Sequence, residues 1–449
     1  MMQNAIKLAV IGGGSSYTPE LVDGVIRKVD ELPVKHVALV DIPDGQEKQD
    51  VVANLVRRMI ERAGLDIEVS ATLERDRAIR GADFVVTQFR VGGLSARAQD
   101  ERIPLRYNVI GQETTGPGGF AKALRTVPVA LEIARDVERF APNAWIINFT
   151  NPSGIVTEAI TRYTRARCIG LCNVPIGIQR AIAAGLGVSP RTVRVEFIGL
   201  NHLSWARRIT VNGKDVTSNV LAHDTVKAQF ERMGPQGARA DGLLEALGMV
   251  PSYYLRYYYF HDVIVEEQKR QVQEGKGTRA EQVMAIEKEL FKRYADPNLS
   301  EKPPELSQRG GAWYSEAALS VISAIYNDKD EVHVVNVPSR GCVPDLPHDA
   351  VVEVNCLING RGAHPIPTSQ WPASVRGLAQ HVKAYEQLTV EAAVEGDEQL
   401  AYLALLNHPL VPGASTASSL LEDILHVNVQ YLTTFHEFFR RNRGPKKDS

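Results

Sequence analysis

Six short apolar runs in the first 171 residues, separated by helical patterns, constrain the fold of this chain most. Continuous apolar runs are typical of strands buried on both faces of a parallel sheet. Between the first two runs, Leu21, Val22, Val25, Ile26 and Val29 recur at helical spacing. Strands alternating with helices predict a Rossmann-like, doubly wound α/β domain of the kind that binds dinucleotides. The predicted strands are Ile6–Ile11, His36–Asp41, Ile67–Ala71, Asp83–Thr87, Ala144–Phe149 and Arg167–Leu171.

The pattern changes after residue 171. Helices dominate up to about residue 330, and apolar stripes at helical spacing return near the C-terminus. We therefore expect two domains, a dinucleotide-binding domain over residues 1–171 and a mixed α+β domain over residues 172–449. The strands predicted for the second domain are Val193–Ile198, Arg207–Val211, Val332–Asn336 and Ala350–Cys356, the first two as an antiparallel pair.

The first apolar run leads directly into three glycines and a serine, residues 12–15. Such a turn lets the backbone approach a pyrophosphate, and the following helix offers it free N–H groups. Asp41 ends the second run, where a carboxylate accepts hydrogen bonds from a ribose diol and favours NAD over NADP. Tyr17 replaces the third glycine of the dinucleotide fingerprint, so a glycine-rich turn without a cofactor is the alternative. The predicted NAD-binding residues are Gly12, Gly13, Gly14, Ser15 and Asp41.

Charge and composition exclude several classes of protein. With 51 basic and 53 acidic residues, the formal charge of −2 offers no long-range attraction for nucleic acid or anionic lipid. The N-terminal residues lack the features of a signal peptide, and no stretch reaches the ~20 apolar residues that a membrane helix needs. Four cysteines in 449 residues do not make a disulfide framework. We expect a cytoplasmic protein whose partner is neither a nucleic acid nor a membrane.

Three segments carry reactive residues toward the carboxyl edge of the predicted sheet. Residues 109–119 contain four glycines and no hydrophobic period, which predicts an irregular loop carrying one carboxylate, Glu113. Asn151 follows the fifth predicted strand. Cys172 and His202 each follow a later strand, and a thiolate with an imidazole can form a two-ligand metal site completed by substrate or water. A small buried cysteine and a hydrogen-bonded histidine are the alternative interpretation.

Five tyrosines lie within residues 253–259, more than a core requires, because each buried phenol needs a hydrogen-bond partner. One interpretation is an aromatic helix that packs one face on a core. The other is that a phenol beside a cation serves as a base.

Together these segments resemble glycoside hydrolase family 4, whose members depend on NAD rather than on two carboxylates. The resemblance spans nearly the whole chain. Within the family, Cys172-Asn173 resembles the branch that acts on 6-phospho-β-glucosides, since members acting on α-linked substrates tend to carry Cys-Asp. The matching segments are residues 12–15, Gly111-Gln112-Glu113-Thr114, Asn151-Pro152, Cys172-Asn173-Val174-Pro175, Asn201-His202 and Pro251–Tyr259.

The resemblance implies catalytic and metal-binding roles. Cys172 and His202 would hold a divalent cation, usually Mn²⁺. Tyr254, in the pattern Pro-x-x-Tyr-x-x-Tyr-Tyr, would be the base, with Tyr253 and Tyr257 as the alternatives.

The resemblance also implies how substrate is held and how the base is tuned. Glu113 would adjust the basicity of the tyrosine, and Arg279 would reach the sugar phosphate, whereas Arg309 is left outside this set. The domain over residues 172–449 would serve metal and substrate binding and would form the subunit interface of a homodimer or homotetramer. The residues that would bind the sugar are Arg97, Asn151 and Asn173.

The implied reaction is the hydrolysis of a phosphorylated disaccharide or aryl glucoside without net redox change. Oxidation of the sugar at C3 by NAD acidifies the C2–H bond, and the base then removes that proton. The aglycone is eliminated, water adds, and C3 is reduced again. The implied architecture resembles that of lactate and malate dehydrogenases.

Three alternatives stand beside this function. A member of the same family could act on 6-phospho-α-glucosides or α-galactosides. An NAD-dependent 2-hydroxy-acid dehydrogenase would share the two-domain layout but need no metal, which leaves Cys172 unexplained. A non-catalytic NAD-binding protein would leave the loop at residues 111–119 and the tyrosines unexplained.

Overall fold

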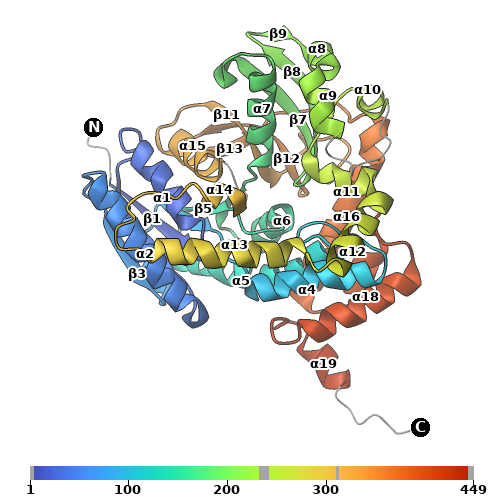
Figure 1. The fold of residues 1–449 in the computed structure, drawn as a ribbon, viewed down its shortest axis with the longest axis horizontal. Helices are drawn as coiled ribbons and strands as arrows, with labels where there is room; N and C mark the ends of the chain where they lie inside the picture. Colours follow the sequence, from blue (N-terminus) through green and yellow to red (C-terminus); the bar gives the residue numbers. More distant parts are fainter. Residues whose placement is uncertain (1–4, 232–241, 310–312, 443–449) are drawn as a thin grey trace.

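The centre of the computed structural model, which describes residues 5–231, 242–309 and 313–442, is a nine-stranded sheet (Figure 1). The strand order is β13-β12-β11-β6-β5-β4-β1-β2-β3, and β1 to β6 pair in parallel. The 3-2-1-4-5-6 order of these six strands is that of the dinucleotide-binding fold. The strands of the sheet are β1 Ile6–Ile11, β2 Val34–Val40, β3 Glu68–Thr72, β4 Phe84–Thr87, β5 Trp145–Asn148, β6 Arg167–Gly170, β11 Glu331–Pro338, β12 Val351–Asn359 and β13 Gly362–Pro365.

The six predicted runs coincide with β1 to β6 to within two residues at either end. Alternate side chains of a strand face opposite sides of the sheet, and both sides are apolar here. Leu8 and Val10 of β1 belong to the larger core, while Ala9 and Ile11 belong to the core on the other face. The prediction of a buried parallel sheet is confirmed.

Three late strands extend this same sheet. β11 pairs antiparallel with β6 through Asn336 and Gly170, and β12 and β13 follow outward. Strands from the expected second domain therefore continue the sheet of the first, while the boundary after residue 171 stays a prediction. A second, smaller sheet contains β7 Val193–Leu200, β8 Leu203–Val211, β9 Lys214–Asp215 and β10 Val250–Pro251. The predicted antiparallel pair is confirmed in β7 and β8, although β8 begins four residues earlier than expected.

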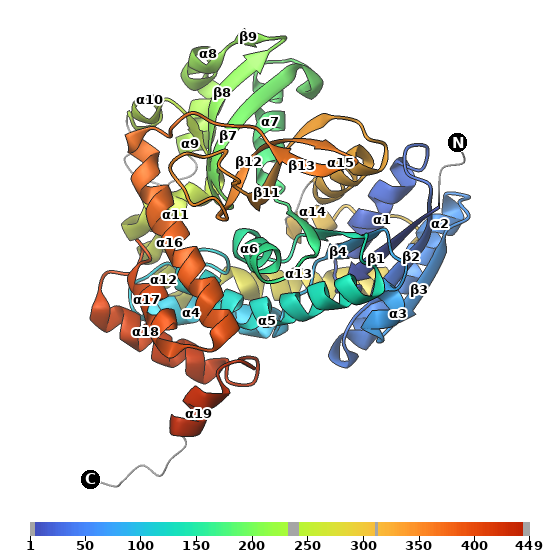
Figure 2. The same cartoon turned by 180° about the vertical axis from the view of Figure 1, so that it is seen from behind.

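Helices cover both faces of the large sheet, and α16 and α18 lie at the end of the molecule opposite β3 in both views, with α17 beside them in Figure 2 (Figures 1 and 2). No helix among the described residues is long and apolar enough to cross a membrane. The helices are α1 Thr18–Arg27, α2 Gln46–Arg62, α3 Arg75–Ile79, α4 Gly93–Arg106, α5 Gly116–Phe140, α6 Ser153–Tyr163, α7 Val174–Gly185, α8 Thr217–Ala222, α9 Asp224–Glu231, α10 Leu243–Leu247, α11 Arg256–Tyr259, α12 His261–Gln273, α13 Arg279–Tyr294, α14 Leu306–Arg309, α15 Tyr314–Tyr326, α16 Ala373–Glu395, α17 Glu398–Leu406, α18 Ala414–Val427 and α19 His436–Asn442.

The prediction of an irregular segment over residues 109–119 is wrong for its second half. α5 begins at Gly116, so three of the four glycines form the first turn of a long helix. Pro117 fits this position because a proline at the start of a helix loses no intrahelical hydrogen bond. The irregular loop is confined to the residues between α4 and α5, and it contains Glu113.

Candidate active site

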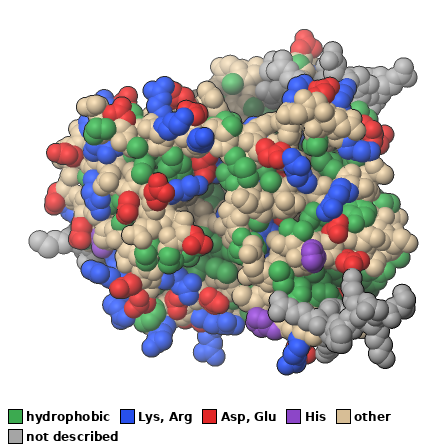
Figure 3. Space-filling view, turned by 60° about the horizontal axis from the view of Figure 1, so that its bottom comes forward, with side chains coloured by type: hydrophobic (Ala, Val, Ile, Leu, Met, Phe, Trp, Pro, Cys, Tyr) green, Lys and Arg blue, Asp and Glu red, His purple; other side chains and the backbone are tan. Residues whose placement is uncertain are grey.

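A cavity of about 1420 Å³ opens at the carboxyl edge of the parallel strands. Doubly wound sheets bind ligands at this edge. The volume exceeds the ~300–1,000 Å³ of a typical pocket, which leaves room for a dinucleotide and a second ligand. A hollow lies near the centre of the face in Figure 3, with acidic and basic side chains around it. The lining residues at the strand ends include Ile11, Val40, Gln88, Phe149 and Leu171.

The glycine loop after β1 forms one end of the cavity. Gly12, Gly14, Ser15 and Asp41 line it, whereas Gly13 packs against β2, where a Cβ would lie 2.8 Å from that of Leu39. Gly12 has a φ of +84°, which favours glycine. The N–H of Gly14 donates to Asp41 Oδ2 at 2.8 Å, and lone pairs of the carboxylate remain for a ribose diol. The local geometry suits the predicted dinucleotide.

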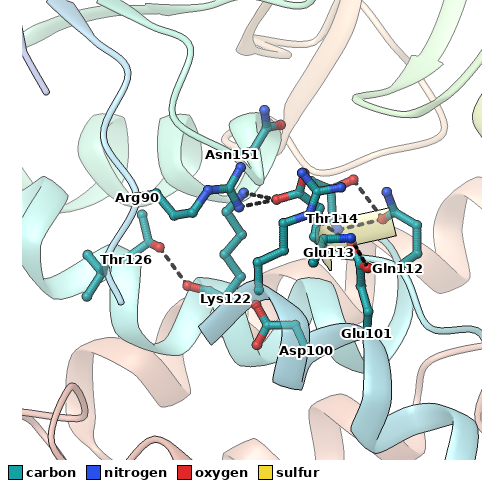
Figure 4. Close-up of polar contacts among 12 residues, drawn as sticks. Arg90, Asp100, Glu101, Gln112, Glu113, Thr114, Lys122, Thr126 and Asn151 are labelled. Atoms are coloured by element: carbon teal, nitrogen blue, oxygen red, sulfur yellow. Dashed lines mark hydrogen bonds and ion pairs between the residues drawn. The ribbon is translucent and has the colours of Figure 1, made fainter. Parts of the chain in front are cut away.

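Glu113 lies among three cations in the cavity wall (Figure 4). Its carboxylate pairs with Arg90, with Arg97 Nη1 at 2.9 Å and with Lys122 Nζ at 2.8 Å. Burial alone would raise the pKa of Glu113, but the three cations hold that pKa well below its usual range. Burial, together with Arg90, lowers the pKa of Lys122 to about 7. The Glu113 carboxylate is therefore ionised at neutral pH and is held between the two arginines.

Cys172 and His202, predicted as metal ligands, both line the cavity. Cys172 lies two residues beyond β6, and its sulfur accepts a hydrogen bond from the Val174 N–H at 3.5 Å. His202 sits in the two-residue turn between β7 and β8, with a φ of +62°. Burial raises the pKa of the Cys172 thiol and lowers the pKa of His202 to about 3, so the imidazole is neutral as a ligand must be. No third His, Cys, Asp or Glu of the described residues completes a metal-binding cluster.

Tyr254 joins this pair through its ring, which stacks on the imidazole of His202 with centroids 3.7 Å apart. Burial raises the pKa of Tyr254 well above its usual range, and the charge of Glu113 adds to this, whereas Arg97 opposes it. Glu113 therefore acts on the phenol in the direction that keeps it protonated. A further positive charge beside the ring is needed before the phenol can act as a base.

The tyrosine segment, residues 253–259, contains tyrosines of both expected kinds, some that line the cavity and some that pack in the core. Tyr253, Tyr254 and Tyr257 line the cavity. Tyr259 instead packs in the core, where its hydroxyl accepts a hydrogen bond from Trp205 Nε1 at 2.9 Å. The segment thus supplies both a cavity wall and a core contact.

Comparison with known proteins identifies the family. The profile of the family 4 glycosyl hydrolases matches residues 7–188, and that of the family 4 glycosyl hydrolase C-terminal domain matches residues 197–411. The chain belongs to glycosyl hydrolase family 4. It is 48% identical to a probable 6-phospho-beta-glucosidase of Bacillus subtilis over 437 residues, which cover 97% of this chain and 99% of the relative.

Solved structures agree with this membership. The 6-phospho-beta glucosidase of Thermotoga maritima, solved with manganese, NAD⁺ and glucose-6-phosphate, superposes on the family 4 chain with a TM-score of 0.87. The two share 37% identity over 95% of this chain and 99% of that one. Malate dehydrogenase of Plasmodium falciparum, at 15% identity, a TM-score of 0.52 and coverage of 87% and 98%, shows the predicted likeness in fold alone.

The residues predicted to bind substrate also line the cavity of the family 4 chain, but in different settings. Arg97 is buried and donates to Glu101 Oε1 at 2.8 Å, so its guanidinium is fixed. Arg279 is exposed at the first turn of α13 and donates to the carbonyl of Gln308 at 3.3 Å. Their substrate contacts stay predictions. The four residues that were predicted to bind substrate and that line the cavity are Arg97, Asn151, Asn173 and Arg279.

Several charged residues of the family 4 site were not predicted. Arg90 lies three residues beyond β4, at the ligand-binding edge, and this position could have drawn attention to it. Lys122 has no such signal, because it is a single lysine within a helical pattern. Glu287 accepts from Lys48 at 2.6 Å and from Arg309 at 2.9 Å, which ties α13 and α14 to α2 beside the glycine loop. Arg309, which was left outside the predicted set, also lines the cavity.

Proposed function

We propose that this family 4 chain hydrolyses 6-phospho-β-glucosides with the help of NAD and a divalent cation such as Mn²⁺. One observation carries the proposal: a single cavity is lined by the glycine loop, by Cys172 and His202, and by Tyr254. Neither a two-carboxylate glycosidase nor a simple dehydrogenase needs this combination. The names of the Bacillus subtilis and Thermotoga maritima proteins support the β-linked, phosphorylated substrate.

The residues present fit both groups. Gly12 and Gly14 present backbone without side chains to the cavity, and Asp41 is fixed beside them. A thiolate and an imidazole are donors that suit a first-row divalent metal. When bound, NAD supplies a reversible hydride acceptor for C3 of the sugar, and the cation supplies Lewis acidity at the neighbouring oxygens.

Within this chemistry the chain has to move one proton at C2. Tyr254 is the proposed base, because its ring is held against His202 at the cavity wall. Arg97 favours the phenolate, whereas Glu113 opposes it and at the same time holds Arg97 in place. The proposal assigns sugar contacts to Arg97, Asn151 and Asn173. Asn173 cannot protonate the leaving group, since an amide is not an acid at neutral pH.

The 6-phosphate is assigned to Arg279. Its guanidinium is exposed at the cavity rim, and a bidentate arginine contact is a strong mode of phosphate recognition. Arg279→Gln should raise KM for a phosphorylated glucoside while leaving any slow turnover of the unphosphorylated one unchanged. An equal effect on both substrates would remove this assignment. A cytoplasmic location and a homo-oligomeric state belong to the same proposal.

The test is a substrate panel with NAD and Mn²⁺ present. We expect release of p-nitrophenol from the β-glucoside 6-phosphate, and little or none from its α-anomer or from the unphosphorylated β-glucoside. Preference for the α-anomer, or for an α-galactoside, would place the chain in another branch of the family. A steady rise of NADH with lactate or malate, without release of any aglycone, would favour a dehydrogenase.

A further inference from the structure

A hydrogen-bonded relay connects the loop after α4 to the ring of His202. Gln112 Oε1 lies 2.5 Å from the N–H of Thr114 and 2.9 Å from its hydroxyl. The Thr114 hydroxyl oxygen lies 3.0 Å from His202 Nδ1. Figure 4 shows Gln112 and Thr114 side by side, next to Glu113.

The direction of each hydrogen bond in the relay follows from chemistry. A backbone N–H can only donate, so the Gln112 atom that faces it must be the amide oxygen rather than the nitrogen. That oxygen has no hydrogen, so the Thr114 hydroxyl must donate its one hydrogen to Gln112. A lone pair of the hydroxyl then faces His202, and Nδ1 of the imidazole must carry a hydrogen to donate to it.

From this geometry we infer that Thr114 and Gln112 are positioning residues that hold His202 as the Nδ1–H tautomer. Its other nitrogen, Nε2, has no hydrogen-bond partner within the described ranges, and His202 lines the cavity. The Nε2 lone pair is then available to a divalent cation. This consequence rests on the proposed function, whereas the tautomer itself does not.

The surrounding chain holds the relay in place. A Cβ at Gly118 would lie 2.2 Å from the carbonyl oxygen of Gln112, so the first turn of α5 packs directly on the loop. Gln268 of α12 donates to the carbonyl of Gly111 at 3.0 Å and accepts from its N–H at 3.1 Å. The three side chains of the segment Gly111-Gln112-Glu113-Thr114 thus have separate roles. Glu113 pairs with the cations, and Gln112 and Thr114 orient the imidazole of His202.

The relay is tested in the full chain after removal of metal, with ¹⁵N-labelled histidine and NMR. The His202 signals are assigned by their loss in His202→Asn. We expect an Nδ1-protonated imidazole in the wild type, in Thr114→Ser and in Gln112→Glu, because each keeps the acceptor. Thr114→Val and Gln112→Met should shift His202 toward the Nε2–H form or toward a mixture. An unchanged tautomer in Thr114→Val, or an Nε2–H wild type, would overturn the inference.

Binding of Mn²⁺, followed by the EPR signal of the free ion, gives a readout that does not depend on turnover. Thr114→Val should bind Mn²⁺ about 10–100-fold more weakly than the wild type, and Thr114→Ser within about threefold of it. Equal losses in both variants, with unchanged thermal unfolding, would overturn the role of the hydroxyl in metal affinity. A wild type that binds no Mn²⁺ yet shows the Nδ1–H form would contradict the proposed function while the tautomer stands.

Discussion

The phenol ring of Tyr254 lies flat against the imidazole of His202, with ring centroids 3.7 Å apart and an angle of 2° between the planes. This contact places the proposed base directly beside a proposed metal ligand. In the metal-free protein the buried phenol is protonated, since its pKa is raised well above the usual range. A cation held by Cys172 and His202 would therefore control whether Tyr254 can accept a proton.

Replacing Tyr254 with phenylalanine should lower kcat by roughly 10²–10⁴-fold, the usual contribution of a positioned base. NAD and Mn²⁺ should still bind, because only one oxygen atom is lost and the ring contact with His202 is kept. Steady-state kinetics with calorimetric binding measures both effects. Tyr257→Phe, a lining tyrosine 6.2 Å from Tyr254 by ring centroids, is the matched control. A larger loss in the control would move the base to Tyr257.

Cys172→Ser should abolish Mn²⁺ binding and activity while NAD binding persists. A serine hydroxyl stays protonated and is a poorer soft ligand than a thiolate, and the glycine loop is unaffected. Cys342→Ser provides the control, since Cys342 is also a buried free thiol but does not line the cavity. Near-normal activity of Cys172→Ser with added Mn²⁺ would show that the sulfur is not a ligand.

Glu113→Gln should destabilise the protein, and more strongly at pH 6 than at pH 8. The substitution leaves buried cations without their carboxylate, a loss on the order of 3 kcal/mol. Lys122, whose pKa is about 7 even with Glu113 present, loses the partner that raises this value. Its folded-state pKa then falls further below that of the unfolded chain, so stability rises with pH.

The double variant Glu113→Gln/Lys122→Met separates these effects. It carries no ionisable amine at position 122, so its loss of stability relative to the wild type should be smaller than that of the single variant at pH 6. This loss should increase rather than decrease toward pH 8, because only the wild type gains stability as Lys122 loses its proton above pH 7. Urea unfolding of the three proteins at both pH values gives the comparison. An equal loss for the single variant at pH 6 and at pH 8 would show that the pKa of Lys122 does not depend on Glu113.

The raised pKa of Glu353 in β12 predicts that stability falls as pH rises, the opposite of the effect of Lys122. Burial raises its pKa to about 7, although Asn201, Ser204 and Asn336 donate hydrogen bonds to it. The folded state therefore binds more protons than the unfolded chain between the ordinary glutamate pKa and about 7. This contribution to stability is present below the ordinary pKa and is lost as the pH rises through 7.

Glu353→Gln should not suffer this loss. Between pH 4.5 and 8, the free energy of unfolding should shift in favour of the variant by on the order of 3 kcal/mol. Urea midpoints for wild type and variant across this range measure the shift. A constant difference between the two proteins would show that Glu353 keeps an ordinary pKa.

The parallel strands could be predicted because a strand buried on both faces is apolar at every position, as Ile6–Ile11 is. The extension of the sheet could not. β11 joins β6 through Asn336 and Gly170, which are far apart in sequence, and β13 has no apolar run to reveal it. Local patterns show that a segment is a strand but do not show which strand it will pair with.

Some residues of the candidate site could likewise be predicted from the sequence, and others could not. Cys172 and Asp41 each follow a strand of the large sheet, so their positions along the chain point to its carboxyl edge. His202 also follows a strand, but one of the second sheet, where it lies in the turn between β7 and β8. The pairing of Glu113 with three cations could not be inferred, because arginine and lysine side chains such as those of Arg90 and Lys122 are usually solvated. The glycines at residues 116–119 favour a loop by sequence because glycine is a poor helix former, whereas the close contact of Gly118 with Gln112 arises only in the folded chain.

Turnover of the β-glucoside 6-phosphate in D₂O tests the central claim most directly. If Tyr254 removes the C2 proton, solvent supplies the one that returns, so the glucose 6-phosphate product should carry deuterium at C2. Mass spectrometry with proton NMR of the product locates the label, and Tyr254→Phe should lose the exchange. Product from the wild-type enzyme with only protium at C2 would contradict proton abstraction and with it the proposed mechanism.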